Sequence, residues 1–162
     1  MNELGTLHFF IGKMGAGKTT YSTKLSKEIG GVLISEDEWL NKLYPNEINN
    51  FDDFLVRHSK LLDVIGPHVQ KILKAGSSVV LDFPANTIKD RKRYLNIANE
   101  IKAPHVATYL NVSNELCLLQ IAKRRLEQPD RVKFDTPEVF EMVTQYFEEP
   151  NESEGLSLHI ME

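Results

Sequence analysis

The chain has 162 residues, of which 41% are hydrophobic and 26% charged, and its formal net charge is −4. This length predicts a single domain spanning residues 1–162, and the composition excludes bulk disorder. No apolar run approaches the roughly 20 residues that span a bilayer, and the N-terminus lacks the features of a signal peptide. Because Cys117 is the only cysteine, no internal disulfide and no cysteine-based zinc cage can form. Together, these features lead us to expect a cytoplasmic protein without a membrane partner.

The first half of the chain alternates short apolar runs with amphipathic stretches. In chain order it predicts a strand over Leu7 to Ile11, a helix over Thr19 to Ile29, a strand over Val32 to Ile34, a brief helix over Asp37 to Leu43 and a helix over Asp52 to Ala75. Gly66 and Pro67 interrupt the apolar stripe of the last helix, so we expect a kink or two helices there.

The second half continues this alternation. It predicts a strand over Val79 to Leu81, a helix from the cap at Thr87 to about Glu100, a strand over Val106 to Leu110, a helix over Ser113 to Glu127 and a helix from Thr136 to Phe147. Leu156, Leu158 and Ile160 alternate with polar residues and predict a final strand.

Strands that alternate with helices predict a parallel sheet, and right-handed crossovers place helices on both of its faces. Ligands of such sheets bind at the carboxyl ends of the strands. We therefore expect the residues after Ile11, Ile34, Leu81 and Leu110 to converge on one site. We place the strand that ends at Ile34 beside the strand that ends at Ile11.

Residues 12–19, with the sequence GKMGAGKT, match the phosphate-binding pattern G-x-x-x-x-G-K-[ST] without a gap. The glycines let consecutive N–H groups wrap a polyphosphate, and the helix that follows adds partial positive charge. Lys18 supplies a cation for the β- and γ-phosphates, and Thr19 offers a hydroxyl to Mg²⁺. A glycine-rich structural turn is the alternative. The predicted nucleotide contacts are Gly12, Met14, Gly15, Ala16, Gly17, Lys18, Thr19 and Thr20.

Three other nucleotide signatures are missing from the chain. The loop lacks the G-x-G-x-x-G of dinucleotide sites, and the His-Arg-Asp and Asp-Phe-Gly elements of protein kinases are absent. The segment NKLY at residues 41–44 ends in the wrong residue for an Asn-Lys-x-Asp guanine reader. ATP is the expected nucleotide by elimination.

Acidic residues follow two of the predicted strands. Asp82 ends an apolar strand, as in the Walker B pattern, in which an acid holds Mg²⁺ or its waters. The alternative for Asp82 is an acid that begins a turn. Asp37 lies between Glu36 and Glu38 after the second strand, where a carboxylate can accept a proton from an incoming hydroxyl. The alternative here is that all three acids form a solvated helix N-terminus.

Basic residues near the end of the chain predict a lid over residues 124–136. The basic segment also includes Lys133, and its candidates for neutralising charge on a transferred phosphate and excluding water are Arg124, Arg125 and Arg131. The alternative is that these side chains stabilise a helix C-terminus. The basic residues between 89 and 93 are interpreted mainly as a solvated face. Cys117 and Trp39 are interpreted as core residues, with stacking on an acceptor as the alternative for Trp39. The five histidines are interpreted as structural or surface residues.

The chain resembles the small P-loop kinases of the AAA-domain type, which are related to the 5′-kinase domain of polynucleotide kinase, chloramphenicol phosphotransferase and zeta toxin. The resemblance runs over nearly the whole chain. It rests on residues 12–19, on ISEDEW at 34–39, on VLD at 80–82 with Asn86, on KRR at 123–125, on TPEVF at 136–140 and on residues 150–155.

This resemblance implies a three-layer α/β/α P-loop NTPase fold with a five-stranded parallel sheet and an arginine-bearing lid. It implies transfer of the γ-phosphate of ATP to a hydroxyl, with Mg²⁺ at Thr19 and Asp82. Asp37 aligns with the family's general base. Arg124 and Arg131 align with lid arginines that act in catalysis, and Arg125 is assigned as a further nucleotide contact, although the spacing leaves the choice between Arg124 and Arg125 open.

The expected acceptor is a small hydroxylated molecule. Polynucleotide kinases usually carry an arginine shortly after the base, where this chain has Leu40 and Asn41, so we expect no nucleic-acid partner. A polynucleotide 5′-hydroxyl kinase and a nucleotide-binding ATPase module without an acceptor remain the alternatives. We expect a monomer or a weak homodimer.

Overall fold

The computed structural model describes residues 3–131 and 134–162. The described strands are β1 (Leu7–Ile11), β2 (Val32–Ser35), β3 (Val79–Asp82), β4 (His105–Leu110) and β5 (Leu158–Met161). The α-helices are α1 (Lys18–Ile29), α2 (Glu36–Leu43), α3 (Phe51–Lys74), α4 (Ile88–Asn99), α5 (Asn114–Glu127) and α6 (Pro137–Thr144). Two 3₁₀ turns, η1 (Pro129–Arg131) and η2 (Glu152–Glu154), complete the elements. None of the helices described is both long and apolar enough to cross a membrane.

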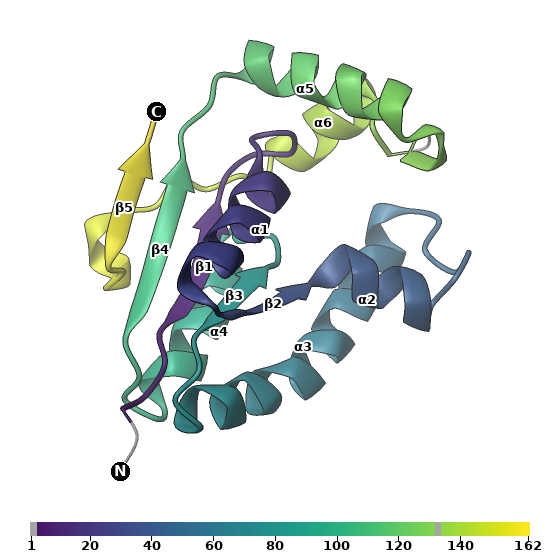
Figure 1. Ribbon diagram of the computed structural model, residues 1–162. Helices are drawn as coiled ribbons and strands as arrows, with labels where there is room; N and C mark the ends of the chain where they lie inside the picture. The colour runs from purple at the N-terminus through teal and green to yellow at the C-terminus, as the bar shows by residue number, and fades with distance from the viewer. Residues whose placement is uncertain (1–2, 132–133) are drawn as a thin grey trace.

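The five strands form one parallel sheet in the order β2-β3-β1-β4-β5 (Figure 1). The predicted neighbourhood of the first two strands was wrong, because β3 lies between β1 and β2. The burial of each strand explains the order. Val79, Val80 and Leu81 of β3 are completely buried, whereas Val32 of β2 is 40% exposed, so β3 takes an inner position and β2 an edge.

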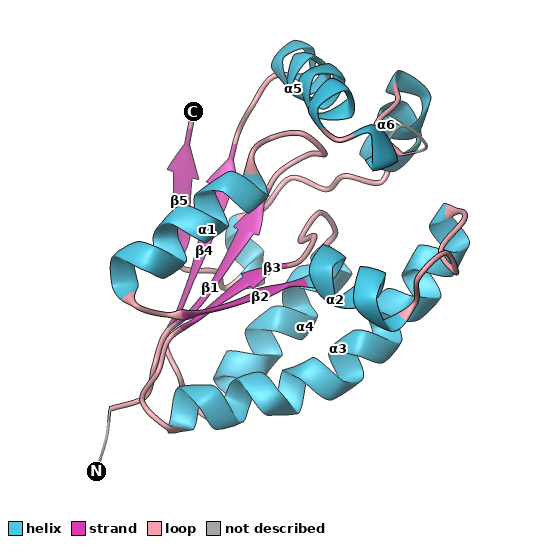
Figure 2. Ribbon diagram, turned by 45° about the vertical axis from the view of Figure 1, so that its right-hand side comes forward, coloured by secondary structure: helices cyan, strands magenta, loops and turns pink. Residues whose placement is uncertain are grey.

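Helices cover both faces of the sheet, which completes the predicted three-layer α/β/α fold (Figure 2). Neighbouring residues of β1 point to opposite faces. Phe9 packs with the core under α3 and α4, and its ring lies 5.5 Å from that of Tyr94. Phe10 packs on the other side with Cys117 and Ile121 of α5. Cys117 is fully buried, as predicted.

Helix α3 runs through Gly66 and Pro67 without a break, so the expected division into two helices was wrong. Proline removes one backbone hydrogen bond and strains the turn before it, at a cost of about 3 kcal/mol. The same helix buries an apolar stripe against the sheet, and each fully buried leucine or isoleucine contributes roughly 1.5–3 kcal/mol. The stripe therefore outweighs the proline; its members are Leu61, Leu62, Ile65, Val69 and Leu73.

Two elements near the end of the chain are shorter than predicted. Helix α6 ends at Thr144, because Phe147 leaves the helix to stack on Tyr109 and to lie under the Lys13 ammonium. Strand β5 begins at Leu158, whereas Leu156 packs against the main core before the strand starts.

Two other interpretations were also wrong. Trp39 is 38% exposed on α2 and is not a core residue. The basic stretch on α4 is not one solvated face, because Arg91 is fully buried and binds Glu154 through two hydrogen bonds of 2.7 and 3.1 Å. Burying the guanidinium requires a paired carboxylate. Glu154 lies 63 residues away, where no local pattern could indicate it.

Candidate active site

The carboxyl ends of the inner strands converge around the loop between β1 and α1. Ser35, at the end of β2, lies opposite Asp82 at the end of β3. The Gly12 N–H lies 3.4 Å from Asn86 Oδ1, which follows β3. A Cβ built on Gly12 would lie 3.4 Å from Leu110 at the end of β4. The four predicted strand ends therefore lie around a single loop.

The phosphate-binding loop has the backbone that its glycines allow. Gly15 and Gly17 have φ angles of 81° and 101°, which residues with a Cβ rarely adopt. Ala16 is buried and its N–H donates to Lys13 O, Met14 packs against the core on the α5 side, and the side chain of Thr20 is exposed. The first turn of α1 carries no acidic residue, so no carboxylate there repels an anion.

Lys18 begins α1 and turns back over the loop. Its ammonium donates hydrogen bonds to Gly12 O at 2.5 Å and to Lys13 O at 3.4 Å. Burial lowers the pKa of Lys18 to about 8, although nearby Asp82 favours the charged form. Arg124 also lowers this pKa, which places a lid arginine within electrostatic reach of the loop.

The two predicted metal-binding residues touch each other. Thr19 Oγ1 donates to Asp82 Oδ2 at 2.9 Å. Burial raises the pKa of Asp82, the hydrogen bond from Thr19 opposes that rise, and the charge of Asp37 adds to it. A hydroxyl and a carboxylate are hard oxygen ligands of the kind that Mg²⁺ prefers, and Mg²⁺ usually takes its remaining ligands from water and phosphate. The pair therefore fits this ion.

The three consecutive acids after β2 have different surroundings. Ser35 caps α2, and the helical turn directs each following side chain differently. Glu36 is 1% exposed and lies inside the protein. Glu38 is exposed and pairs with Lys42 at 3.0 Å. Asp37 is exposed and lies 3.8 Å from Arg131 Nη1, so among the three acids it is the one that faces the lid.

A residue that sequence analysis did not select holds the lid together. Asp135 is 1% exposed and accepts hydrogen bonds from Arg124 at 2.6 and 2.9 Å and from Arg131 at 2.9 Å. Burial by itself would raise the pKa of Asp135, but the bonds from the two arginines hold it below its ordinary value. The i,i+4 spacing of Arg131 and Asp135 is the one local signal for this pair.

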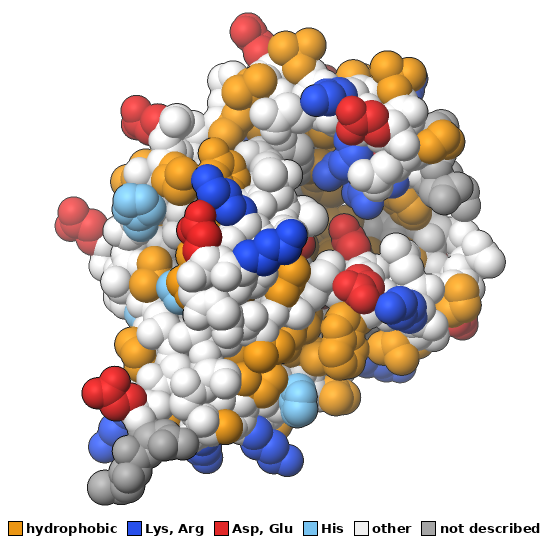
Figure 3. All heavy atoms as spheres, in the orientation of Figure 1, with side chains coloured by type: hydrophobic (Ala, Val, Ile, Leu, Met, Phe, Trp, Pro, Cys, Tyr) orange, Lys and Arg blue, Asp and Glu red, His pale blue; other side chains and the backbone are white. Residues whose placement is uncertain are grey.

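The remaining lid residues are placed differently. Arg125 is exposed on α5 and is not among the described partners of Asp135. Lys133 lies outside the described residues. Figure 3 shows a hollow between the part of the molecule formed by α5 and α6 and the part formed by α2 and α3. Basic side chains gather on its upper side and acidic side chains on its lower side, which suits a phosphate donor and a proton acceptor that face each other (Figure 3).

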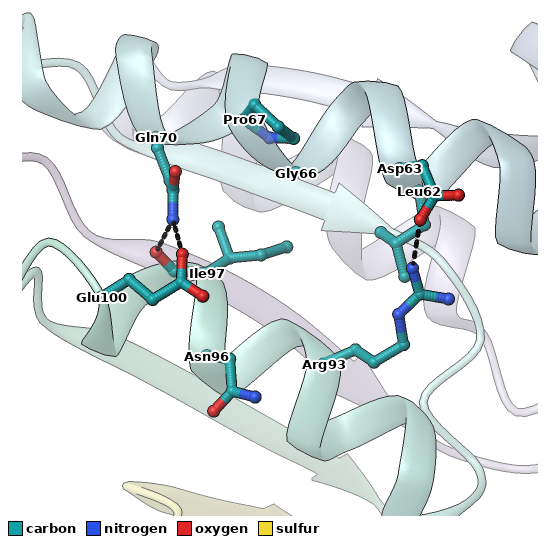
Figure 4. Close-up of a pocket in the computed structure, with 9 residues that line it drawn as sticks. All are labelled: Leu62, Asp63, Gly66, Pro67, Gln70, Arg93, Asn96, Ile97 and Glu100. Atoms are coloured by element: carbon teal, nitrogen blue, oxygen red, sulfur yellow. Dashed lines mark hydrogen bonds and ion pairs between the residues drawn. The ribbon is translucent and has the colours of Figure 1, made fainter.

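A separate cavity of about 290 Å³ lies between α3 and α4 (Figure 4). Its polar side chains are paired across the gap: Arg93 binds Asp63 at 3.0 Å, and Gln70 donates to Glu100 at 2.8 Å. None of the residues that line it belongs to the loop, to the Thr19–Asp82 pair or to the lid. Its polar groups join the two helices, and we assign it no part in the site.

The chain is similar to known kinases in sequence and in structure. A family model described as an AAA domain matches residues 7–150. A deoxyguanosine kinase of Bacillus subtilis is 27% identical over 159 residues, and the match covers 83% of this chain and 73% of that protein.

Two solved structures share the fold at low sequence identity. An APS kinase of Mycobacterium tuberculosis, in complex with AMPPNP and APS, superposes with a TM-score of 0.70 at 12% identity and covers 98% of this chain and 88% of its own. Kti12 of Chaetomium thermophilum, in complex with ADP-AlF3, has a TM-score of 0.66 at 20% identity. The match covers 96% of this chain and 88% of the Kti12 chain. Together with the family match over most of the chain, the loop and the sheet identify this protein as a member of the AAA-domain family with the fold of a P-loop kinase.

Proposed function

We propose that this protein transfers the γ-phosphate of ATP to a hydroxyl of a small-molecule acceptor, with Asp37 as the general base. One observation carries the proposal. Lys18 and the Thr19–Asp82 pair lie on one side of the site, and Asp37 lies across from them within 3.8 Å of a lid arginine. The groups proposed to bind the phosphate donor and to accept the proton therefore come from separate elements, which supports the proposal.

In the proposed reaction the acceptor oxygen forms a bond to the γ-phosphorus, and the bond from that phosphorus to the bridging oxygen of ADP breaks. Asp37 takes the proton of the acceptor hydroxyl. Lys18 and the loop N–H groups bind the phosphates, and Mg²⁺ held at Thr19 and Asp82 would neutralise charge on the β- and γ-phosphates. Arg124 and Arg131 stabilise the charge that gathers on the transferred group.

The surroundings of α4 favour a small acceptor over a polynucleotide. A nucleic-acid groove needs free basic side chains along its length. In the cluster between residues 89 and 93, Arg91 is buried against Glu154 and Arg93 is paired with Asp63. Two of the four charges that supported a polynucleotide kinase are therefore already neutralised within the protein.

The test is a transfer assay with γ-labelled ATP and a panel of acceptors. Nucleosides come first, because the sequence relative is a deoxyguanosine kinase, followed by sugars and a 5′-hydroxyl oligonucleotide. A labelled phosphate ester formed from a small acceptor, and lost in Asp37→Asn, supports the proposal. Labelling of the oligonucleotide alone favours the polynucleotide kinase, and release of free phosphate without any ester favours the ATPase module.

A further inference from the structure

Three charged side chains form a row next to the proposed base, and the first two of them, Glu36 and His58, are buried. Glu36 Oε2 lies 2.5 Å from His58 Nδ1, and His58 Nε2 lies 3.4 Å from Asp90 Oδ1. The side chains of Glu36 and His58 are 1% and 6% exposed. The row joins α2, α3 and α4, and no step of the proposed mechanism uses it.

A charged histidine lowers the net negative charge of the row, because it stands between two carboxylates. Buried carboxylates are costly unless they face a positive charge or a donor. Glu36 Oε1 has no hydrogen-bond partner among the described residues, so His58 is the group that offsets the charge of Glu36. Burial by itself would lower the pKa of His58, but Asp90 and Glu36 together raise it to about 9.

The titratable groups nearest to the imidazole are acids. Glu36 on α2 and Asp90 on α4 act on the ring directly; beyond them lie Asp37 on α2 and, on α4, Tyr94 and the cation Arg93. The other contacts of the ring are apolar: Phe54 lies one turn earlier on α3, and Phe83 follows β3. Burial raises the pKa of Glu36, so Glu36 is the base that shares the proton with His58 across their short contact.

The row acts on the residue next to Glu36. Asp37 follows Glu36 directly in the first turn of α2, and Ser35, which caps that turn, lies opposite Asp82 in the sheet. Leu40 already buries the apolar side of α2. An apolar contact is not directional, whereas a charged hydrogen bond from His58 sets the rotation of the first turn.

We propose that protonated His58 is a positioning residue, which holds Glu36 in place and thereby aims the carboxylate of Asp37 at the acceptor hydroxyl. This inference rests on the proposed function, because it assigns His58 a role in the same reaction. Loss of the charge on His58 would weaken its hold on Glu36, because a neutral imidazole can still donate from Nδ1 but no longer offsets the charge of the buried carboxylate. The first turn of α2 would then shift, while the phosphate-binding loop, which belongs to other elements, would keep its geometry.

The test compares wild type with His58→Gln, and His68→Gln is the matched control because it is exposed on the same helix. At pH 7.5 we expect His58→Gln to lower kcat by roughly 10- to 100-fold with an unchanged KM for ATP, as for a misplaced catalytic group. The control should match wild type. The ratio of the wild-type kcat to the variant kcat should fall toward one as the pH rises through about 9. A pH-independent ratio, or a parallel change in KM, overturns the inference.

A second variant keeps the test informative if His58→Gln does not fold. Asp90→Asn removes one of the two carboxylates that hold the proton on His58. Its kcat should therefore decline at a lower pH than that of wild type, which a purely structural contact would not produce. An unchanged midpoint contradicts the role of His58.

Hydrogen exchange separates this inference from the proposed function, because it requires no acceptor. Faster exchange at residues 36–40 in His58→Gln, with unchanged exchange at residues 12–19, supports the positioning role of His58 even if no acceptor is phosphorylated. Unchanged exchange in both segments, in an enzyme that phosphorylates its acceptor, refutes the positioning role of His58 and leaves the proposed kinase activity standing.

Discussion

Arg131 Nη1 lies 3.8 Å from Asp37 Oδ2, so the lid reaches the acid that is proposed to act as the general base. The same arginine binds Asp135, which also binds Arg124. A single buried carboxylate thus holds two lid arginines, one of which contacts α2 across the hollow.

Asp37→Asn tests the base directly. The amide cannot accept the proton of the acceptor hydroxyl, so the transfer rate should fall by roughly 100-fold or more, whereas ATP affinity stays nearly unchanged. Glu38→Gln is the matched control, since Glu38 is the next acid and is exposed. Initial rates with labelled ATP and calorimetric affinities provide the measurement. A parental rate in Asp37→Asn would remove the base assignment.

Asp82→Asn tests the metal position. Thr19 would retain a hydrogen-bond partner, but the carboxylate that attracts Mg²⁺ or its waters would be lost. We expect the Mg²⁺ concentration for half-maximal transfer to rise by roughly 10- to 100-fold. Asp52→Asn, an exposed acid in the first turn of α3, serves as control. Equal Mg²⁺ dependence in both variants and wild type would show that Asp82 does not serve the metal.

Asp135→Asn tests the lid anchor through stability. Removing one partner of a buried ion pair should lower the free energy of unfolding by about 3 kcal/mol, measured by urea denaturation. Because the pKa of Asp135 is lowered from 3.8 on folding, its contribution is fully present above pH 3.8 and disappears as the pH falls through the lower value of the folded protein. The difference between wild type and variant should be constant from about pH 5 to 8 and shrink below about pH 4. A difference that grows in acid would contradict the assignment.

Gly15→Ala tests the shape of the phosphate-binding loop. A Cβ at Gly15 would lie 2.6 Å from Cys117 O and 2.8 Å from Ile121 Cγ1, so the loop must move. Gly30→Ala is the matched control, because Gly30 also has a positive φ but its Cβ would meet nothing within 4 Å. Both variants carry backbone strain of about 1–2 kcal/mol. Calorimetry should show roughly tenfold weaker ATP binding for Gly15→Ala alone, and equal affinities would contradict a loop shaped for phosphates.

The order of the elements follows closely from local sequence. Apolar runs bounded by glycine predicted β1, and the caps at Thr87 and Thr136 predicted the starts of α4 and α6, because these signals act within one or two turns of the backbone. Residues 12–19 predicted the phosphate-binding loop for the same reason. Pro67 suggested two helices where the structure has one, since the penalty of a proline is local but the burial that outweighs it comes from the sheet.

By itself, the sequence determined the class of fold, the phosphate-binding loop and the family. The reason is that the residues of a contiguous motif fix their local backbone geometry without contacts from distant parts of the chain. Only the tertiary structure decided that β3 separates β1 from β2, that Asp135 holds the lid arginines and that His58 lies between Glu36 and Asp90. These are contacts between residues distant in the chain or turned into the core. The charged contacts among them are strong because water is excluded around them. Only the packing of the folded chain decides which charged side chains are removed from water.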